Sequence, residues 1–86
     1  MEDLIQFLIR LLQREFPGSV PELEQVKPLQ KVGGFLIWSG FDGVEQIDRQ
    51  QRLSGALKRG LDPDQRRQIT TILTLTPEES ALMQTE

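Results

Sequence analysis

Cysteine and histidine are both absent from the 86 residues of this sequence. Zinc and iron–sulfur centres are held mainly by cysteine thiolates and histidine imidazoles, so the usual ligands of either centre are missing. Most serine and cysteine hydrolases also depend on a histidine base. Without cysteine no disulfide can form, and nothing marks the chain as secreted. We therefore expect a protein that has no metal or other cofactor and is not an enzyme.

Long apolar runs are absent as well. A membrane-spanning helix needs about 20 consecutive apolar residues, and no stretch of the sequence approaches that length. The first residues, MEDLIQFLIRLLQREF, carry acids where a secretory signal has lysine or arginine, and Arg10 interrupts their apolar pattern. The length predicts one domain over residues 1–86, with a thin core and little room for a deep active-site cleft. Together these features predict a small cytoplasmic protein that does not enter the membrane.

Basic residues are unevenly distributed, although the chain as a whole has a net charge of −3. Residues 49–67 hold six basic residues and two acids, whereas the segment after Leu75 holds acids only. This clustering indicates either a solvated helix face with local ion pairs, such as Asp48 with Arg52, or a binding face. An acidic chain is not an obvious nucleic-acid binder, but arginine binds carboxylates and phosphates alike. The six basic residues are Arg49, Arg52, Lys58, Arg59, Arg66 and Arg67.

Hydrophobic periodicity, β-branched residues and turn signals divide the chain into helices and strands. Helices are expected over residues 3–16, 44–60 and 77–83, with a turn at residues 62–64 that has its own cap and first-position proline, and strands over 22–27, 35–38 and 69–75. Prolines bracket the first strand, which is typical of an edge, and the second strand is apolar on both faces, which is typical of a central strand. The order α-β-β-α-α-β-α predicts an α+β two-layer sandwich, in which helices cover one face of a three-stranded mixed sheet.

Local signals predict details within these elements. Adjacent glycines make residues 32–34 a predicted turn into the second strand. Asp48 is a candidate N-cap for the helix that follows it, and Thr76 with Glu79 has the pattern of a capping box. Trp38 is the only tryptophan, and we expect it to pack against core or strand neighbours rather than to act as a stacking platform.

Three segments of the sequence resemble the BolA family: SGFDG at 39–43, IDRQQRLSGALKRGL at 47–61 and ITTILTLTPEE at 69–79. BolA-like proteins have a Phe-x-Gly turn after the second strand and an Arg-His-Arg-like helix start followed by a regularly spaced leucine. Their final strand runs into Thr-x-Thr-Pro-Glu-Glu. The residues that match are Phe41, Gly43, Arg49, Leu57, Thr74, Thr76, Pro77, Glu78 and Glu79. The resemblance implies a class II KH-like fold, which has the same order of elements as the one predicted here.

The metal-ligand residues of that family are replaced in this sequence. The resemblance places a family histidine, which helps to ligate an iron–sulfur cluster shared with a monothiol glutaredoxin, at Gln68. The amide oxygen of glutamine is neutral and hard, whereas iron in these clusters takes imidazole or thiolate. The family's Arg-His pair is Arg49-Gln50 here, and the loop over residues 27–34 holds neither histidine nor cysteine. We therefore expect that cluster sharing has been lost.

These observations favour a small non-enzymatic BolA-like adaptor or regulatory protein that acts by protein–protein interaction, with a glutaredoxin-type protein as a partner. The interaction would use a face that contains both the helix of Arg49 and the strand end at Gln68. The alternative is a KH-like nucleic-acid-binding regulator that uses the basic face over residues 49–67. The candidate partner-binding residues are Arg49, Gln50, Arg52, Lys58, Arg59, Arg66, Arg67 and Gln68.

Overall fold

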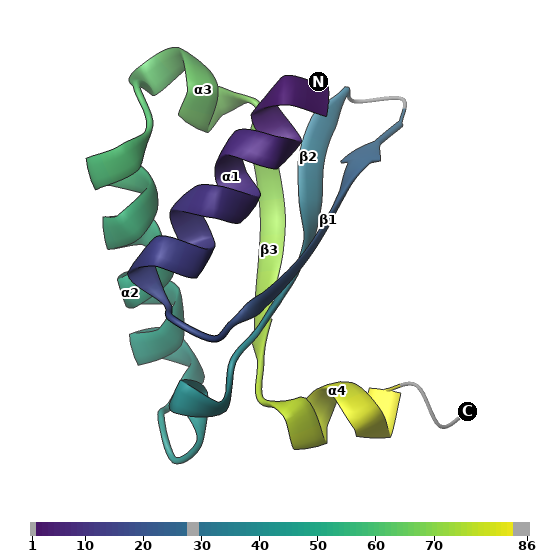
Figure 1. The fold of residues 1–86 in the computed structure, drawn as a ribbon, viewed down its shortest axis with the longest axis vertical. Helices are drawn as coiled ribbons and strands as arrows, with labels where there is room; N and C mark the ends of the chain where they lie inside the picture. The colour runs from purple at the N-terminus through teal and green to yellow at the C-terminus, as the bar shows by residue number, and fades with distance from the viewer. Residues whose placement is uncertain (1, 28–29, 84–86) are drawn as a thin grey trace.

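The computed structural model describes residues 2–27 and 30–83 of the chain. Its elements, in chain order, are helix α1 (Glu2–Glu15), strands β1 (Val20–Val26) and β2 (Lys31–Ile37), the 3-10 helix η1 (Ser39–Phe41), helices α2 (Gln46–Gly60) and α3 (Pro63–Arg67), strand β3 (Ile69–Leu75) and helix α4 (Pro77–Met83). The predicted order of elements is confirmed (Figure 1), and β3 and α4 have the predicted bounds.

The three strands form one mixed sheet in the order β1-β2-β3. β1 pairs antiparallel with β2, whereas β3, which returns after α2 and α3, pairs parallel with β2. β2 is therefore the central strand and β1 an edge strand, as their flanking prolines and apolar content predicted. The α+β class and the mixed three-stranded sheet are confirmed by this arrangement.

The glycine pair in β2 is not a turn, so the prediction for residues 32–34 was wrong. Gly34 has a φ of +143°, and a Cβ added there would run into the carbonyl oxygen of Glu22 on β1. A Cβ on Gly33 would come within 2.9 Å of the carbonyl oxygen of Thr71 on β3. The two glycines let the neighbouring backbones approach β2 closely, which is the other common reason for glycine inside a strand.

Helices α1 and α2 lie on one face of the sheet and form the predicted helical layer (Figure 1). Leucines at helical spacing give both helices an apolar stripe that packs on the sheet. The buried apolar side chains are those of Leu8, Leu11, Leu12, Phe16, Val32, Leu36, Ile37, Phe41, Leu53, Ala56, Leu61 and Ile72. Helix α4 lies instead beyond the end of β3 (Figure 1). Among the described residues, no helix combines the length and apolar content that crossing a bilayer requires.

The side of the sheet that faces away from α1 and α2, which we call the open face, carries exposed apolar side chains. Thr74 points into the helical layer and is 1% exposed, whereas the next residue toward the N-terminus, Leu73, points to the open face and is 44% exposed. Val20 on β1 is 52% exposed. Strand alternation and register place these side chains on the open face: Val20, Glu22, Glu24, Phe35, Leu73 and Leu75.

Candidate functional site

Arg49, the first basic residue of the predicted cluster, is buried inside the fold. Its side chain is 7% exposed and forms an ion pair with Glu79, at 2.7 Å between Nη1 and Oε1. Arg49 Nε donates to the Val44 carbonyl at 2.7 Å, and Nη1 also donates to the Thr74 carbonyl at 3.2 Å. The guanidinium lies over the Phe41 ring, 5.7 Å from its centroid. Arg49 therefore connects α2 to β3 and α4 and is not part of an exposed cationic surface.

Glu79 joins this arrangement to the start of α4. Its Oε1 accepts the Thr76 N–H at 2.8 Å, and the Glu79 N–H donates to Thr76 Oγ1 at 3.2 Å. The capping box predicted from Thr76 and Glu79 is thus confirmed. The hydrogen bond from the Arg49 guanidinium, followed by the one from the Thr76 N–H, lowers the pKa of the Glu79 carboxyl below its ordinary value.

Gln50 binds the chain itself, at the free edge of β3. Its Nε2 donates to the Ile72 carbonyl and to Thr74 Oγ1, both at 3.2 Å. One turn earlier in α2, Gln46 Nε2 donates to the Thr74 carbonyl at 3.0 Å, and Gln46 Oε1 accepts from Thr74 Oγ1 at 2.9 Å. Edge-strand carbonyls are otherwise open to pairing with another chain. The two glutamines therefore hold α2 against β3 and occupy acceptors on that edge.

Arg49 and Gln68, which were expected to belong to one binding face, lie far apart along β3. Arg49 contacts Thr74 near the C-terminal end of β3, whereas Gln68 precedes the first residue of that strand. Six residues of extended strand separate the two positions by about 20 Å. Gln68 is exposed at the C-terminal end of α3, where its carbonyl accepts the Val32 N–H at 2.7 Å. Arg49 with Gln50 therefore lies near one end of β3 and Gln68 near the other, whereas Arg52 and Arg59 line one hollow along α2.

Arg59, near the end of α2, is paired with the end of α1. Its Nη2 lies 2.6 Å from Oε1 of Glu15. The hydrogen bond from Arg59 is the main reason that the pKa of the Glu15 carboxyl lies below its ordinary value. The Arg59 side chain remains largely exposed, so the pair lies at the surface and still presents one face of the guanidinium to solvent.

The two arginines of α3 also have partners within the chain. Arg66 Nη1 donates to the carbonyls of Lys58 and Leu61, at 3.4 and 3.3 Å, and so binds the end of α2. Arg67 pairs with Asp64 at 2.6 Å within α3 itself. Both contacts are typical of cations at helix ends, where they complement the helix dipole.

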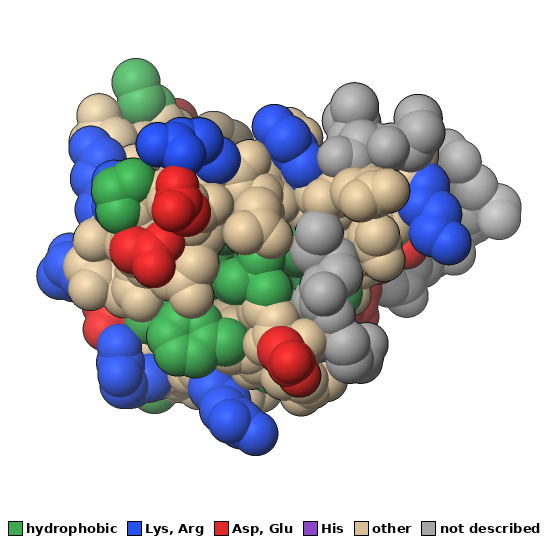
Figure 2. Space-filling model, turned by 90° about the horizontal axis from the view of Figure 1, so that it is seen from above, with side chains coloured by type: hydrophobic (Ala, Val, Ile, Leu, Met, Phe, Trp, Pro, Cys, Tyr) green, Lys and Arg blue, Asp and Glu red, His purple; other side chains and the backbone are tan. Residues whose placement is uncertain are grey.

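Within residues 2–27 and 30–83, Arg52, Lys58 and Arg66 make no ion pair, and of these three only Arg66 has side-chain hydrogen bonds, to the Lys58 and Leu61 carbonyls. Asp48, the candidate N-cap, lies in the first turn of α2, and the N-cap is Glu45. The Asp48–Arg52 ion pair that a solvated helix face would have does not form among the described residues. Figure 2, which views the molecule from the α3 end, shows lysines and arginines spread around the perimeter and separated by other side chains. The cations do not gather into one continuous patch on that face.

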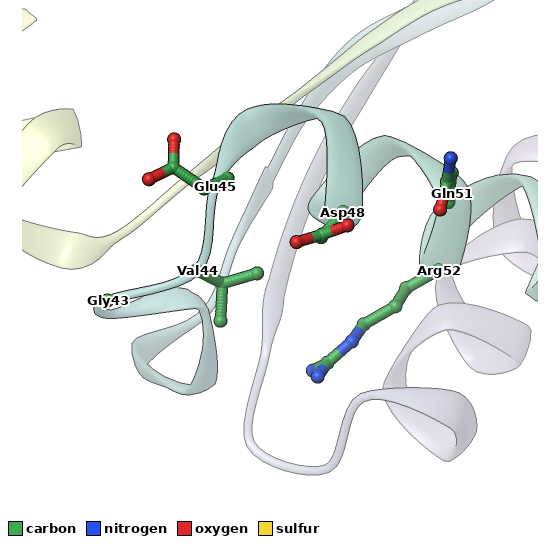
Figure 3. Close-up of a pocket in the computed structure, with 6 residues that line it drawn as sticks. All are labelled: Gly43, Val44, Glu45, Asp48, Gln51 and Arg52. Atoms are coloured by element: carbon green, nitrogen blue, oxygen red, sulfur yellow. The ribbon is translucent and has the colours of Figure 1, made fainter.

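Arg52 lies in a groove along the side of α2 that faces the end of α1. One hollow, of about 520 Å³, is lined by Gly43, Val44, Glu45, Asp48, Gln51 and Arg52 (Figure 3). An adjoining hollow, of about 260 Å³, is lined by Glu15, Phe16, Trp38, Gln51, Arg52, Gly55 and Arg59. Because both hollows include Gln51 and Arg52, they form one surface, which we call the α2 groove. Figure 3 shows the Arg52 side chain extending away from the helix into this region.

Trp38 forms one wall of the α2 groove and is held in a fixed orientation. Its Nε1 donates to the Pro17 carbonyl at 2.8 Å. Its ring meets Phe16 and Phe41 edge to face, with centroids 5.2 and 5.1 Å apart. The expected packing of Trp38 against core neighbours is confirmed, but the ring is only partly buried and also lines the groove.

Sequence reasoning found Arg52 and Arg59 but missed the rest of the groove. Residues 48, 52, 55 and 59 repeat at helical spacing on one side of α2, and the repeat includes Gly55, whose missing side chain deepens the surface. That spacing is visible in the sequence. The approach of Trp38, which comes from the segment after β2, is tertiary and leaves no local signal.

The residues at the family's cluster-ligand positions do not fit an iron–sulfur cluster. Gln68 offers a neutral amide, and the described part of the segment 27–34, which was expected to be a loop but from Lys31 onward belongs to β2, offers no thiolate or imidazole. Residues 28–29 of that loop lie outside the described residues. Within the described ranges, no three histidine, cysteine or acidic side chains converge as a metal site would need.

No family model, no curated protein and no solved structure matches this chain. The residues that resemble the BolA motifs lie close together in the fold. Phe41, Arg49, Thr74, Thr76 and Glu79 form one connected interior cluster, joined by the contacts of the buried guanidinium. The motif residues thus hold α2, β3 and α4 together, and the α2 groove lies on the other side of α2.

Proposed function

We propose that this chain is a non-enzymatic BolA-like adaptor that binds a protein partner through the α2 groove. The observation that carries the proposal is the guanidinium of Arg52, which has no ion pair among the described residues and lies in a groove walled by the fixed ring of Trp38. Tryptophan and arginine are the residues most enriched at protein-binding hot spots. A preoriented ring also reduces the entropy lost on binding.

The order of elements and the mixed sheet support the BolA-like part of the proposal. The motif residues have consistent structural roles as well. Phe41 is fully buried at the turn after β2, and Gly43 has a φ of +76°, which favours glycine. Arg49 at the start of α2 meets Glu79 at the start of α4. Fold resemblance alone does not assign a function, so the partner has to be argued from the groove.

The charges of the groove favour a protein over a nucleic acid. Glu45, Asp48 and Glu15 line it beside the arginines, and these carboxylates would repel a phosphate backbone. A surface of mixed charge instead complements the mixed charges of another protein. Four of the six cations that would serve the KH-like alternative, Arg49, Arg59, Arg66 and Arg67, have partners within the chain.

A monothiol glutaredoxin is the partner that the family resemblance suggests. Binding would rely on protein contacts alone, because Gln68 does not replace the histidine ligand of the family. When this chain binds, the absorption and magnetic spectra of a glutaredoxin cluster should therefore show no sign of a new imidazole ligand. Imidazole coordination from this chain is ruled out by its composition.

Affinity capture with an Arg52→Ala variant tests the proposal. We expect the wild-type protein, used as bait, to retain a protein partner, and a monothiol glutaredoxin should be tested directly. Arg52→Ala should weaken the affinity for that partner about tenfold, equivalent to about 1.4 kcal/mol. Arg10→Ala, which removes an exposed arginine from α1, is the matched control and should bind as the wild type does. Equal binding by both variants would contradict the proposal. So would tight binding to RNA or DNA whose affinity falls steeply with salt.

A further inference from the structure

The open face has the wrong composition for a sheet surface that meets only water. Sheets with one solvated face normally alternate apolar residues toward the core with polar residues toward solvent. Here Phe35 on β2 and Leu73 on β3 are cross-strand neighbours on the open face, and Leu75 continues the row beside Ile37, which is itself buried. Val20 extends the apolar row onto β1 because it pairs with Ile37. An apolar surface of this kind, with a polar rim, marks an interaction site.

The open face ends in a small hollow beside α4. The hollow has a volume of about 160 Å³ and is lined by Glu22, Phe35, Leu75, Ser80 and Met83. It is large enough for one aliphatic side chain. Met83 is 51% exposed at its rim, so α4 borders the hollow without filling it. A partner could therefore anchor one apolar residue between the sheet and α4.

The rim of the open face along β1 is acidic. Glu22 pairs across the sheet with Phe35 and Glu24 with Gly33, and both carboxylates are exposed on the same side as the apolar row. Neither makes an ion pair with a cation in the described ranges. Lys31 on β2 is exposed on the same side but pairs with Val26, beyond Glu24, so the part of the rim beside Phe35 is acidic. Charge complementarity there favours a partner that carries lysine or arginine next to its apolar residues.

The area and the edges of the sheet limit the shape of that partner. Three strands of seven residues cover about 300 Å², well below the roughly 800 Å² per partner of a stable dimer interface. Strand addition is disfavoured at both edges, since β1 carries Pro21 and glutamates, and Gln46 and Gln50 occupy carbonyls of β3. A helix is about 10 Å wide and would cover the open face by lying across it.

We propose that the open face binds a short amphipathic helix of a partner protein, with an apolar stripe flanked by lysine or arginine. One apolar residue of that helix enters the hollow beside α4, and the basic residues meet Glu22 and Glu24. The open face lies on the opposite side of the sheet from α1 and α2, so this interaction is separate from binding at the α2 groove.

The test is fluorescence anisotropy of a labelled helical peptide built from leucine and lysine, titrated with the full chain. We expect saturable binding, and we expect Leu73→Asp to weaken it at least about tenfold. Phe7→Asp is the matched control, because Phe7 on α1 has the same 44% exposure as Leu73 but lies away from the open face. Circular dichroism establishes that each variant is folded. No saturable binding to the wild type, or equal loss in both variants, would overturn the proposal.

Charge reversal tests the second half of the proposal independently of the apolar contact. Glu22→Lys with Glu24→Lys should weaken binding of the leucine–lysine peptide and strengthen binding of a leucine–glutamate peptide. Asp42→Lys with Glu78→Lys makes the same change of net charge at exposed acids elsewhere and should have much less effect. Equal effects of both reversals would mean nonspecific attraction and would overturn the proposal. A Leu73-dependent dimer in sedimentation, or binding to anionic vesicles in place of the peptide, would do so as well.

Discussion

Arg49 and Glu79, which are 30 residues apart in the chain, form an ion pair in which the guanidinium is buried and the carboxylate is partly exposed. The guanidinium loses its hydration on burial, and hydrogen bonds to Glu79 and two backbone carbonyls and a contact with the face of Phe41 replace it. A buried charge of this kind is tolerated only when its donors are satisfied. The contacts of the ion pair therefore join three elements, α2, β3 and α4.

Replacing Arg49 with methionine should destabilise the fold by about 2–3 kcal/mol, because the Val44 carbonyl loses the Arg49 donor, the Thr74 carbonyl keeps only the donor from Gln46, and Glu79 loses its partner. The measurement is urea unfolding followed by circular dichroism. Arg52→Met is the control, since it removes an arginine from the same helix that has no ion pair among the described residues, and its effect should stay within about 0.5 kcal/mol. Equal stability of the two variants would contradict the structural role of Arg49.

Stability should fall on acidification, in part because of Glu79. The hydrogen bonds from Arg49 and Thr76 lower the pKa of this carboxyl in the folded state relative to the unfolded chain. Its contribution is therefore fully present above the unfolded value of about 4.3 and is lost as pH falls through the folded pKa. We expect the difference in unfolding free energy between wild type and Glu79→Gln to shrink as pH falls below that value. Glu78→Gln, at the neighbouring exposed acid, is the control, and a Glu79→Gln difference that does not change with pH would count against the ion pair.

Gly34→Ala should be among the most damaging small substitutions in the chain. A methyl group there meets the Glu22 carbonyl on the neighbouring strand, and φ is positive, so we expect a loss of about 3 kcal/mol or more. Gly43→Ala is the control, because it also has positive φ but nothing within 4 Å of the new methyl, and it should cost only about 1–2 kcal/mol. Thermal unfolding of the two variants separates steric conflict from backbone strain. If Gly34→Ala were as stable as Gly43→Ala, the Glu22 carbonyl of β1 would not approach residue 34 of β2 as closely as the structure shows.

The elements set by local chemistry were predictable from the sequence. The alternation and β-branched residues over Ile69–Leu75 gave the correct strand, and Thr76 with Glu79 gave the correct cap, because both signals lie within a few residues. The glycine pair at 33 and 34 was misread because glycine marks both turns and close backbone approach. Only the position of Glu22 and Thr71 on the neighbouring strands decides between the two.

The candidate site was harder to predict because charge in a sequence does not reveal a partner. Arg49 and Arg52 are three residues apart in the same helix, yet Arg49 is buried against Glu79, whereas Arg52 lies in the groove with no ion pair in the part of the chain that the structure describes. The alternation of residues in β3 likewise did not predict which side of the strand packs against the helices. Thr74 faces inward because Gln46 and Gln50 satisfy its polar groups, and this turns Leu73 outward.

Trp38 gives the protein a built-in optical reporter. It is the only indole in the chain, it touches Phe16 and Phe41, and it forms a wall of the α2 groove. Its intrinsic emission should therefore change when the groove is occupied, with no dye attached, and change differently when the aromatic cluster comes apart on unfolding. A single ultraviolet excitation can thus follow both occupancy and folding in the unmodified molecule.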